Sequence, residues 1–263
     1  MSTSQVKDKV IVVTGASKGI GLATAQALIS RGAKVALLAR DKDRLMAAVA
    51  GLKSGDAFGL PVDVCDKSAV EKAFAAVIGK WGRLDGLVNN VGFQYSRRIE
   101  VSPESEIRRL VDLNFLSAVF TCQAAIPLMR KAGGGRIVNV SSASVRNDNE
   151  FAHMAFYSAS KAALDHFSKE LRHEVKKDNI MVTVFSPGAV ATGSIENFDP
   201  VAVGEAMQAW LEKGPKFDGA MQADTVGAAL AGCFELPPGV AIEFMEVRPN
   251  MVTPKQLESE WKQ

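Results

Sequence analysis

Tyr157 and Lys161 stand four residues apart in the segment YSASK, a spacing that places both side chains on one face of a helix. A phenol has an ordinary pKa of about 10, so alone it is a sluggish acid or base near neutral pH. A neighbouring ammonium favours the phenolate and lowers that pKa. The pair is therefore a candidate acid–base centre that carries a proton to or from an alkoxide oxygen. The same spacing also arises by chance on ordinary helices, so the upstream motifs decide between the two interpretations.

A glycine-rich turn, Thr14–Gly21 (TGASKGIG), follows a β-branched run and opens a helical pattern. Its spacing is Gly-x-x-x-Gly-x-Gly rather than the Gly-x-Gly-x-x-Gly of many nicotinamide enzymes. Glycines let the backbone approach a pyrophosphate closely, and a helix N-terminus stabilises its charge. In this strand–turn–helix context the motif predicts a dinucleotide site.

The end of the second predicted strand distinguishes NAD from NADP. An acidic residue there would bind the ribose 2′-hydroxyl of NAD, whereas a basic one accommodates the 2′-phosphate of NADP. Ala39 occupies the expected acidic position and Arg40 follows it, while Lys18 in the glycine turn could approach the same phosphate. These cations favour NADP(H), and Asp41 is interpreted as a helix N-cap.

Short β-branched runs alternate with helical patterns along most of the chain, which predicts a parallel sheet with helices on both faces. Strands are predicted over Lys9–Thr14, Lys34–Ala39, Ala57–Val62, Leu84–Asn89, Arg136–Val140, Ile180–Phe185 and Ala241–Val247. Helices are predicted over Ile20–Ser30, Asp41–Leu52, Lys67–Lys80, Pro103–Arg130, Tyr157–Lys176 and Ala223–Glu235.

No linker, repeat or low-complexity run divides the sequence, so residues 1–263 are predicted to form one domain. The region Gly188–Met221 breaks the alternation, because it is rich in Gly, Pro, Ala and Met and has no predicted strand. Long insertions of this kind often bind ligands. We expect a substrate-binding lid over about residues 188–221.

Composition excludes several function classes. The net charge of +2 gives no electrostatic case for a nucleic acid or an anionic membrane as partner. The three cysteines have no disulfide or zinc spacing and suit a reducing compartment, and the three histidines are too scattered to predict a metal site. The start of the chain is polar and no segment approaches the length of a membrane span, so a cytoplasmic protein is expected.

Several motifs taken together identify a family. Thr14–Gly21, the segment Asn89-Asn90-Val91-Gly92, Asn114, Ser142 and Tyr157-x-x-x-Lys161 resemble the short-chain dehydrogenase/reductase family in its single-domain, NADP(H)-dependent branch, over roughly Lys7–Thr192. The resemblance implies an α/β protein: a three-layer, doubly wound Rossmann fold with a mostly parallel seven-stranded sheet. It also implies a nicotinamide cofactor that lies across the carboxyl ends of the strands.

The resemblance further implies a role for each catalytic residue. Tyr157 is the general acid in reduction and the general base in oxidation, and Lys161 lowers its pKa and holds the nicotinamide ribose. Ser142 hydrogen-bonds the substrate carbonyl, and Ser141 is the alternative residue for this role. Asn114 positions a water in the proton relay. Asp63 contacts the adenine ring, and Asn89 supports the sheet beside the cofactor. The implied cofactor-binding residues are Gly15, Ser17, Lys18, Gly19, Ile20, Gly21, Arg40, Asp63, Val64, Asn90, Gly92, Tyr157, Lys161, Pro187, Gly188, Val190 and Thr192.

The chain departs from the family pattern at three places. Val91 replaces the usual alanine, and the interval from Ser142 to Tyr157 is long, so that the loop Ala143–Phe156 is expected to form a wall of the substrate pocket. The C-terminal segment Leu236–Pro249 resembles the branch that contains hydroxy-acid and serine dehydrogenases. Candidate pocket residues are Phe93, Tyr95, Val145, Phe151, Met154, Phe156, Phe198, Met207 and Trp210. Arg97, Arg98 and Arg146 either meet an anionic substrate or are solvated surface charges.

The leading functional hypothesis is an NADPH-dependent carbonyl reductase, acting on a ketone or aldehyde and reversible as an alcohol dehydrogenase. One alternative is a non-catalytic NADP-binding regulator of the same fold, and another is a dehydrogenase of a hydroxy acid or other secondary alcohol that uses NAD(P)+. An enoyl reductase is disfavoured because position 155, where those relatives carry the tyrosine, is alanine. The resemblance implies a homotetramer, or a homodimer, that pairs the helices at about 104–130 and at Tyr157.

Overall fold

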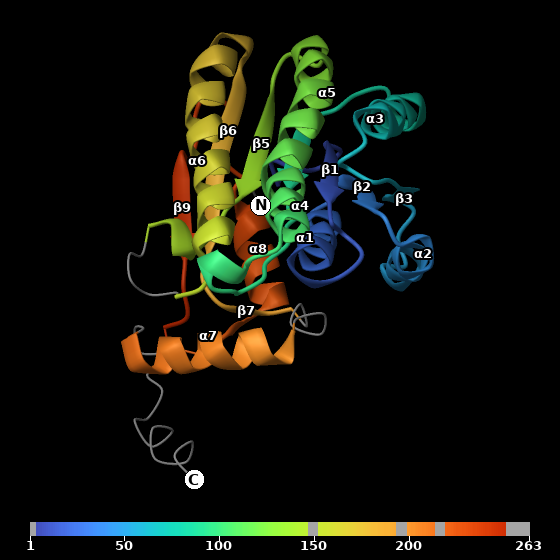
Figure 1. The fold of residues 1–263 in the computed structure, drawn as a ribbon. Coiled ribbons are helices and arrows are strands. Elements are labelled where there is room, and N and C mark those ends of the chain that lie inside the picture. Colours follow the sequence, from blue (N-terminus) through green and yellow to red (C-terminus); the bar gives the residue numbers. More distant parts are fainter. Residues whose placement is uncertain (1–3, 147–151, 193–198, 214–218, 251–263) are drawn as a thin grey trace.

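Seven strands form one parallel sheet at the centre of the protein (Figure 1). The computed structural model describes residues 4–146, 152–192, 199–213 and 219–250. The strands are β1 (Val10–Thr14), β2 (Lys34–Ala39), β3 (Ala57–Pro61), β4 (Gly86–Asn89), β5 (Gly135–Val140), β6 (Ile180–Pro187) and β9 (Phe244–Val247). Their order across the sheet is β3-β2-β1-β4-β5-β6-β9, and every neighbouring pair is parallel.

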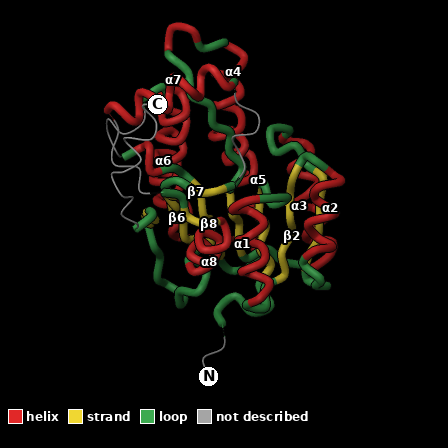
Figure 2. The backbone as a smooth tube through the Cα atoms, turned by 90° about the horizontal axis from the view of Figure 1, so that it is seen from below, coloured by secondary structure: helices red, strands yellow, loops and turns green. Residues whose placement is uncertain are grey.

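Helices cover both faces of this sheet, so that the protein has three layers (Figure 2). One face carries α1 (Gly19–Ser30), α2 (Lys42–Gly51) and α8 (Ala223–Gly232). The other face carries α3 (Lys67–Trp81), α5 (Ser117–Lys131) and α6 (Ala155–Val175), and α4 (Glu104–Val111) leads into α5. The predicted α/β, doubly wound Rossmann fold is therefore confirmed.

The apolar runs form strands because the central strands are covered on both faces. In β1, Ile11 and Val13 pack into the core beneath α1 and α8, while Val10 and Val12 pack into the core beneath α3 and α5. All four side chains are buried. Both cores therefore fix the register of β1, whose carboxyl end carries the glycine turn.

The strand order reverses beside β1. The chain builds outward from β1 to β3 and then returns to place β4 on the other side of β1. In doubly wound sheets, ligands bind outside the carboxyl ends of the strands at such a reversal. The fold thus places the predicted dinucleotide site between the ends of β1 and β4.

The long helix predicted over Pro103–Arg130 is interrupted. Between α4 and α5, residues Asp112–Leu116 form a π-helical segment, and Asn114 lies in its middle. Single π-turns of this kind often occur at functional sites. The local widening carries the amide of Asn114 into the buried interior, where it is 1% exposed.

Residues Glu104–Lys131 nevertheless form one continuous helical stretch, which is long and apolar enough to cross a membrane by length and composition alone. The prediction that no segment approaches this length is therefore wrong. The stretch owes its apolar character to the sheet beneath it, because Cys122, Ala125 and Met129 belong to the core against the strands. Such a composition is expected of a core helix.

The region predicted to lack strands contains two short ones. β7 (Val190–Ala191) and β8 (Met221–Gln222) pair in parallel and form a separate two-stranded sheet. Between them, α7 (Pro200–Lys213) lies across the carboxyl end of the central sheet, below the start of α6 in Figure 1. The strands escape prediction because each is only a dipeptide, too short for an alternating pattern.

Candidate active site

The glycine turn is shaped by close approaches that exclude side chains. Gly15 has a φ of 64° and Gly19 a φ of 55°, which are left-handed values that favour glycine. A Cβ at Gly21 would lie 2.5 Å from the carbonyl oxygen of Gly15 and 2.6 Å from Nδ2 of Asn90. Only glycine fits there, so α1 begins directly against the end of β1.

The N-terminus of α1 is suited to an anion. The N-cap residue Lys18 makes no side-chain capping hydrogen bond with the described residues, and the first turn of the helix contains no acidic residue. Ser17 and Ile20 are half-buried on either side of Lys18 and Gly19. The exposed backbone N–H groups and the helix dipole therefore form a cradle that fits a pyrophosphate.

Asn90 joins the glycine turn to the end of β4. Its Nδ2 donates to the carbonyl oxygens of Thr14 and Gly15 at 3.1 and 3.3 Å. The hydroxyl of Thr14 accepts from the backbone N–H groups of Asn90 and Val91 at 3.0 and 3.2 Å. Thr14 thus helps to fix the site, a role that sequence reasoning did not assign although it begins the quoted motif.

Two cations lie at the edge where the adenosine ribose would be expected. Lys18 and Arg40 are both exposed, and neither forms an ion pair with another of the described residues. The predicted N-cap role of Asp41 is confirmed, because its carboxylate accepts from the backbone N–H of Arg44 at 3.0 Å. Asp41 is therefore engaged in its own helix, and the cations remain available.

The segment after β3 contains Asp63 and Val64, which are predicted to bind the adenine part of the cofactor. Asp63 is exposed and its Oδ1 accepts from the backbone N–H of Cys65 at 3.0 Å, which forms a tight turn. Val64 is buried. Burial, with the carboxylate of Asp63 as a second cause, raises the pKa of the Cys65 thiol to about 11, so this thiol is unreactive at neutral pH.

The segment after β6 closes over the glycine turn from the other side. Pro187 ends β6, and the backbone N–H of Gly188 donates to the carbonyl oxygen of Val247 at 2.8 Å. Val190 lies in β7. A Cβ at Gly19 would lie 3.4 Å from the Cβ of Thr192, so the two segments are in contact range. The structure thus brings together the two ends of the predicted cofactor site.

Lys161 is almost completely enclosed, with 3% of its surface exposed. Its Nζ donates to the carbonyl oxygen of Val140, the last residue of β5, at 2.7 Å. Burial lowers the pKa of Lys161 to about 8, and the carboxylate of Asp165 opposes that change. A Cβ at Gly92 would lie 3.3 Å from this Nζ, so glycine leaves the approach to the ammonium open.

Tyr157 lies one helical turn before Lys161 and is held by Ser142. Burial raises the pKa of the Tyr157 phenol, and a side-chain hydrogen bond with Ser142 lowers it in part. The expected lowering by Lys161 is therefore not seen in the protein alone, because burial disfavours the phenolate more strongly than its neighbours stabilise it. Ser142, rather than the buried Ser141, contacts the phenol, which agrees with the assignment of Ser142.

Asn114 connects the loop after β4 to α6 through hydrogen bonds. Its Oδ1 accepts from the backbone N–H of Phe93 at 2.7 Å, and its Nδ2 donates to the carbonyl oxygen of Phe93 at 2.8 Å and to Oγ of Ser160 at 2.9 Å. Ser160 donates in turn to the carbonyl oxygen of Tyr157 at 2.7 Å. Sequence reasoning missed Ser160, whose type and spacing resemble those of any helical serine.

Asn89 supports the sheet through a buried amide network. Its Nδ2 donates to Oδ1 of Asn139 at 2.8 Å, and its Oδ1 accepts from the Thr121 hydroxyl at 2.6 Å. Asn139 donates to Oγ of Ser168 on α6 at 2.8 Å. This chain of hydrogen bonds ties β4, β5 and α6 together behind the Tyr157–Lys161 face.

Helix α7 is attached to the segments on both sides of it in space. Arg97 pairs with Asp199, just before α7, at 3.2 Å, and Trp210 Nε1 donates to the carbonyl oxygen of Ala152 at 2.7 Å. The backbone N–H of Arg97 donates to the carbonyl oxygen of His153 at 2.8 Å. Helix α7 is therefore fastened both to the loop after β4 and to the residues before α6.

The pocket candidates divide into three groups. Tyr95 and Met154 are buried, and Phe93, Val145, Phe156 and Trp210 are half-buried. Met207 on α7 is 45% exposed, and its assignment to the pocket stays a prediction. Phe151 and Phe198 lie outside the described residues.

The arginines considered for an anionic substrate have carboxylate partners within the protein. Arg97 lies 3.3 Å from Glu106 as well as near Asp199, and Arg98 lies 3.5 Å from Glu205 on α7. Arg146 lies 3.6 Å from Asp165. These pairs account for the three charges without an anionic ligand.

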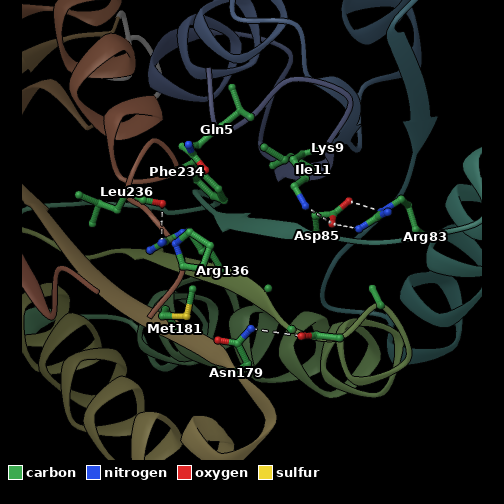
Figure 3. A pocket seen from close by; sticks show the side chains of 16 residues that line it. Gln5, Lys9, Ile11, Arg83, Asp85, Arg136, Asn179, Met181, Phe234 and Leu236 are labelled. Carbon is green, nitrogen blue, oxygen red and sulfur yellow. Dashed lines mark hydrogen bonds and ion pairs between the residues drawn. The ribbon is translucent and has the colours of Figure 1, made fainter. Parts of the chain in front are cut away.

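A cavity of about 190 Å³ lies at the opposite edge of the sheet, around the starts of β1, β4 and β5 (Figure 3). Its charges are satisfied locally. Asp85 accepts from Lys9 and from Nε and Nη2 of Arg83, and Arg136 donates to the carbonyl oxygens of Leu236, Pro237 and Val240. These contacts hold the strand starts in place, and the cavity is not part of the predicted active site.

Known proteins resemble the chain in both sequence and structure. The family model described as short chain dehydrogenase matches residues 9–200. An uncharacterized oxidoreductase of Staphylococcus aureus is 34% identical over 193 residues, which cover 73% of this chain and 83% of the relative. A 3-ketodihydrosphingosine reductase of Bacteroides thetaiotaomicron is 34% identical over 192 residues, which cover 73% of this chain and 68% of the relative.

The solved structure of L-sorbose reductase from Gluconobacter frateurii, in complex with NADPH and L-sorbose, superposes with a TM-score of 0.81 at 27% identity, covering 97% of this chain and 100% of that one. The matched family region contains the glycine turn, Asn114, Ser142, Tyr157 and Lys161. The chain therefore belongs to the short-chain dehydrogenase/reductase family, whose members are oxidoreductases that act on CH–OH groups of small molecules.

Proposed function

We propose that the protein is an NADPH-dependent carbonyl reductase, reversible as an alcohol dehydrogenase. The observation that carries the proposal is that Ser142 hydrogen-bonds to the Tyr157 phenol, while Lys161, one helical turn further along α6, lies beside Gly92. The bound nicotinamide would supply the hydride, and this chain's residues would orient the carbonyl and supply the proton. A serine and a tyrosine hydroxyl can stabilise a developing alkoxide without a metal.

The proton would move from the Tyr157 hydroxyl to the substrate oxygen during reduction. Burial keeps the phenol protonated at neutral pH, which is the state that an acid requires. Ser142 would donate to the same substrate oxygen, and the Lys161 ammonium would stabilise the phenolate that remains. Asn114 would fix the position of the loop at Phe93 relative to the helix that carries Tyr157. It would also position the water of the proton relay.

Lys18 and Arg40 support NADP(H) rather than NAD(H). Both are exposed cations at the expected place of the 2′-phosphate, and the neighbouring carboxylate of Asp41 caps α2 instead. The relative L-sorbose reductase was solved with NADPH. Gly15, Ser17, Gly19, Ile20 and Gly21 would hold the pyrophosphate, Asp63 and Val64 the adenine, and Asn90, Gly92, Pro187, Gly188, Val190 and Thr192 the nicotinamide side.

A neutral carbonyl substrate is favoured over a hydroxy acid. A carboxylate substrate would need an uncompensated cation in the pocket, and Arg97, Arg98 and Arg146 are already paired with acidic residues. A non-catalytic NADP-binding regulator is disfavoured because all four catalytic residues are present, with Ser142 hydrogen-bonded to the Tyr157 phenol and Asn114 connected to the Tyr157 backbone through Ser160.

We further propose that residues 188–221 act as a lid over this site and belong to the same single domain. The contacts of Arg97 and Trp210 support this, because they fasten α7 across the carboxyl edge of the sheet. A lid of this kind excludes water from the carbonyl and contributes the substrate contacts.

We also propose a homotetramer, or a homodimer, in which α4, α5 and α6 face their mates. Val111 on α4 is 41% exposed, which supports an apolar contact on that surface. Light scattering at several concentrations tests the assembly, and a monomeric mass throughout would overturn it.

The three free cysteines support a reducing, cytoplasmic location, which cell fractionation would test.

The function is tested by following NADPH absorbance with a panel of ketones and aldehydes, with NADH in parallel. We expect turnover on neutral carbonyls with NADPH and weaker turnover with NADH. NADPH binding without oxidation across the whole panel would instead support the regulator, and turnover confined to carboxylate-bearing ketones would support the hydroxy-acid dehydrogenase.

A further inference from the structure

Next to the catalytic pair on α6 lies a largely enclosed carboxylate to which the mechanism assigns no role. Asp165 stands four residues after Lys161 on α6, so the two side chains share one helix face. The Asp165 side chain is 11% exposed. An acid so deeply enclosed needs a charge partner, because an unpaired buried carboxylate is strongly destabilising.

The partners of Asp165 come from both sides of the active site. Oδ2 lies 3.6 Å from Nη2 of Arg146, which directly follows the short 3-10 helix that Ser142 caps. The guanidinium of Arg146 is 3.8 Å above the ring of Phe244 in β9, which fixes its position. Ser141 and Lys161 also lie near the carboxylate, whose Oδ1 is buried with no hydrogen-bond partner at normal distance among the described residues.

Lys161 in turn depends on Asp165. Its one hydrogen bond among the described residues goes to a neutral carbonyl, that of Val140, which does not compensate a full charge. Burial favours the neutral amine, and among the described residues the charge that opposes this effect is that of Asp165. A neutral Lys161 would no longer stabilise the Tyr157 phenolate.

We propose that Asp165 is a positioning residue that keeps Lys161 in its charged form, and that Arg146 competes with Lys161 for the same carboxylate. Arg146 follows the short 3-10 helix that Ser142 caps, so the position of this segment influences the charge of Lys161 through Asp165. The proposal rests on the proposed function only for its effect on catalysis, since the charge of Lys161 can be measured without turnover.

The test is to titrate Lys161 directly by NMR in protein labelled with 13Cε-lysine, with the signal assigned by its loss in Lys161→Arg. The wild-type midpoint is expected near pH 8. In Asp165→Asn the midpoint falls by about one pH unit, because a neighbouring opposite charge is lost. In Arg146→Gln it rises, because a competing cation is removed. Glu170→Gln, which removes an exposed carboxylate from the same helix, leaves it unchanged.

A purely structural role for Asp165 would lower stability without moving the Lys161 midpoint, and that result overturns the proposal. Thermal unfolding identifies a variant that fails to fold. Arg146 is half-exposed, so Arg146→Gln tests the opposite direction even if Asp165→Asn is unstable. An unchanged or lowered midpoint in Arg146→Gln overturns the competition.

The same variants move the alkaline limb of kcat/KM for carbonyl reduction, to lower pH in Asp165→Asn and to higher pH in Arg146→Gln. If no carbonyl is reduced by the wild type, the proposed function fails, while the NMR titration still decides the role of Asp165.

Discussion

The ammonium of Lys161 is hydrogen-bonded to the carbonyl oxygen of Val140 at 2.7 Å. Val140 ends β5, and the chain continues directly into Ser141 and Ser142. One contact therefore sets the position of the catalytic lysine relative to the strand that delivers the catalytic serine. The Lys161 side chain therefore has a defined position relative to the carboxyl end of β5.

Arg40→Asp should reverse the cofactor preference. A lost charge-assisted contact with the 2′-phosphate is expected to lower kcat/KM with NADPH by about tenfold to hundredfold, while NADH becomes the better substrate. Lys42→Ala is the matched control, because Lys42 is an exposed cation on the adjoining α2. An unchanged ratio of the two kcat/KM values in Arg40→Asp would refute the assignment of the 2′-phosphate site.

Gly21→Ala should damage both folding and NADPH binding. The new Cβ would lie 2.5 Å from the Gly15 carbonyl oxygen, so the turn must shift, at a cost of about 1–3 kcal/mol in the free energy of unfolding. Gly79→Ala is the control, because Gly79 lies within α3 with no atom within 4 Å of a Cβ, and it should stabilise the protein by about 0.5–1 kcal/mol. Urea unfolding and NADPH fluorescence measure both effects, and equal behaviour of the two variants would argue against the packed turn.

Tyr157 should ionise above the ordinary range for a phenol. Burial raises its pKa, so the protonated acid persists through neutral pH and reduction declines only in alkali, while alcohol oxidation, which needs the phenolate, increases with pH. The chain contains two tyrosines, so the difference in tyrosinate absorbance between wild type and Tyr157→Phe isolates this group. Ionisation of Tyr157 below the ordinary phenol pKa of about 10 in the cofactor-free protein would contradict the structure.

Arg97→Gln should loosen the lid. Loss of the ion pairs with Glu106 and Asp199 is expected to raise KM for the carbonyl by about three- to tenfold, with the Kd for NADPH unchanged. Arg108→Gln serves as control, because it removes an exposed pair with Glu104 on α4. If both variants leave KM at the wild-type value, α7 does not hold the substrate.

The fold was largely predictable because buried parallel strands and amphipathic helices have distinct periods. All seven strands of the sheet were predicted, with ends within a few residues, including β1 to within one residue and β9 to within three. The π-helical segment at Asn114 was not, since it depends on hydrogen bonds from Asn114 to Phe93 and Ser160 that exist only after folding.

The sequence predicted which residues form the candidate site better than it predicted their pKa values. Motif spacing indicated Ser142, Tyr157 and Lys161, yet it gave the wrong direction for the Tyr157 pKa, because burial is a tertiary property. Asp165 was overlooked for the same reason, since an acid on a helix is usually solvated.

The central claim is that Tyr157 transfers the proton in carbonyl reduction. The most direct measurement is NADPH oxidation by Tyr157→Phe on a carbonyl that the wild type reduces, together with NADPH binding by fluorescence. We expect the Kd for NADPH to remain at the wild-type value while kcat falls by about 10²- to 10⁴-fold, as expected when a general acid is removed. A variant that reduces the carbonyl at the wild-type rate would contradict the account.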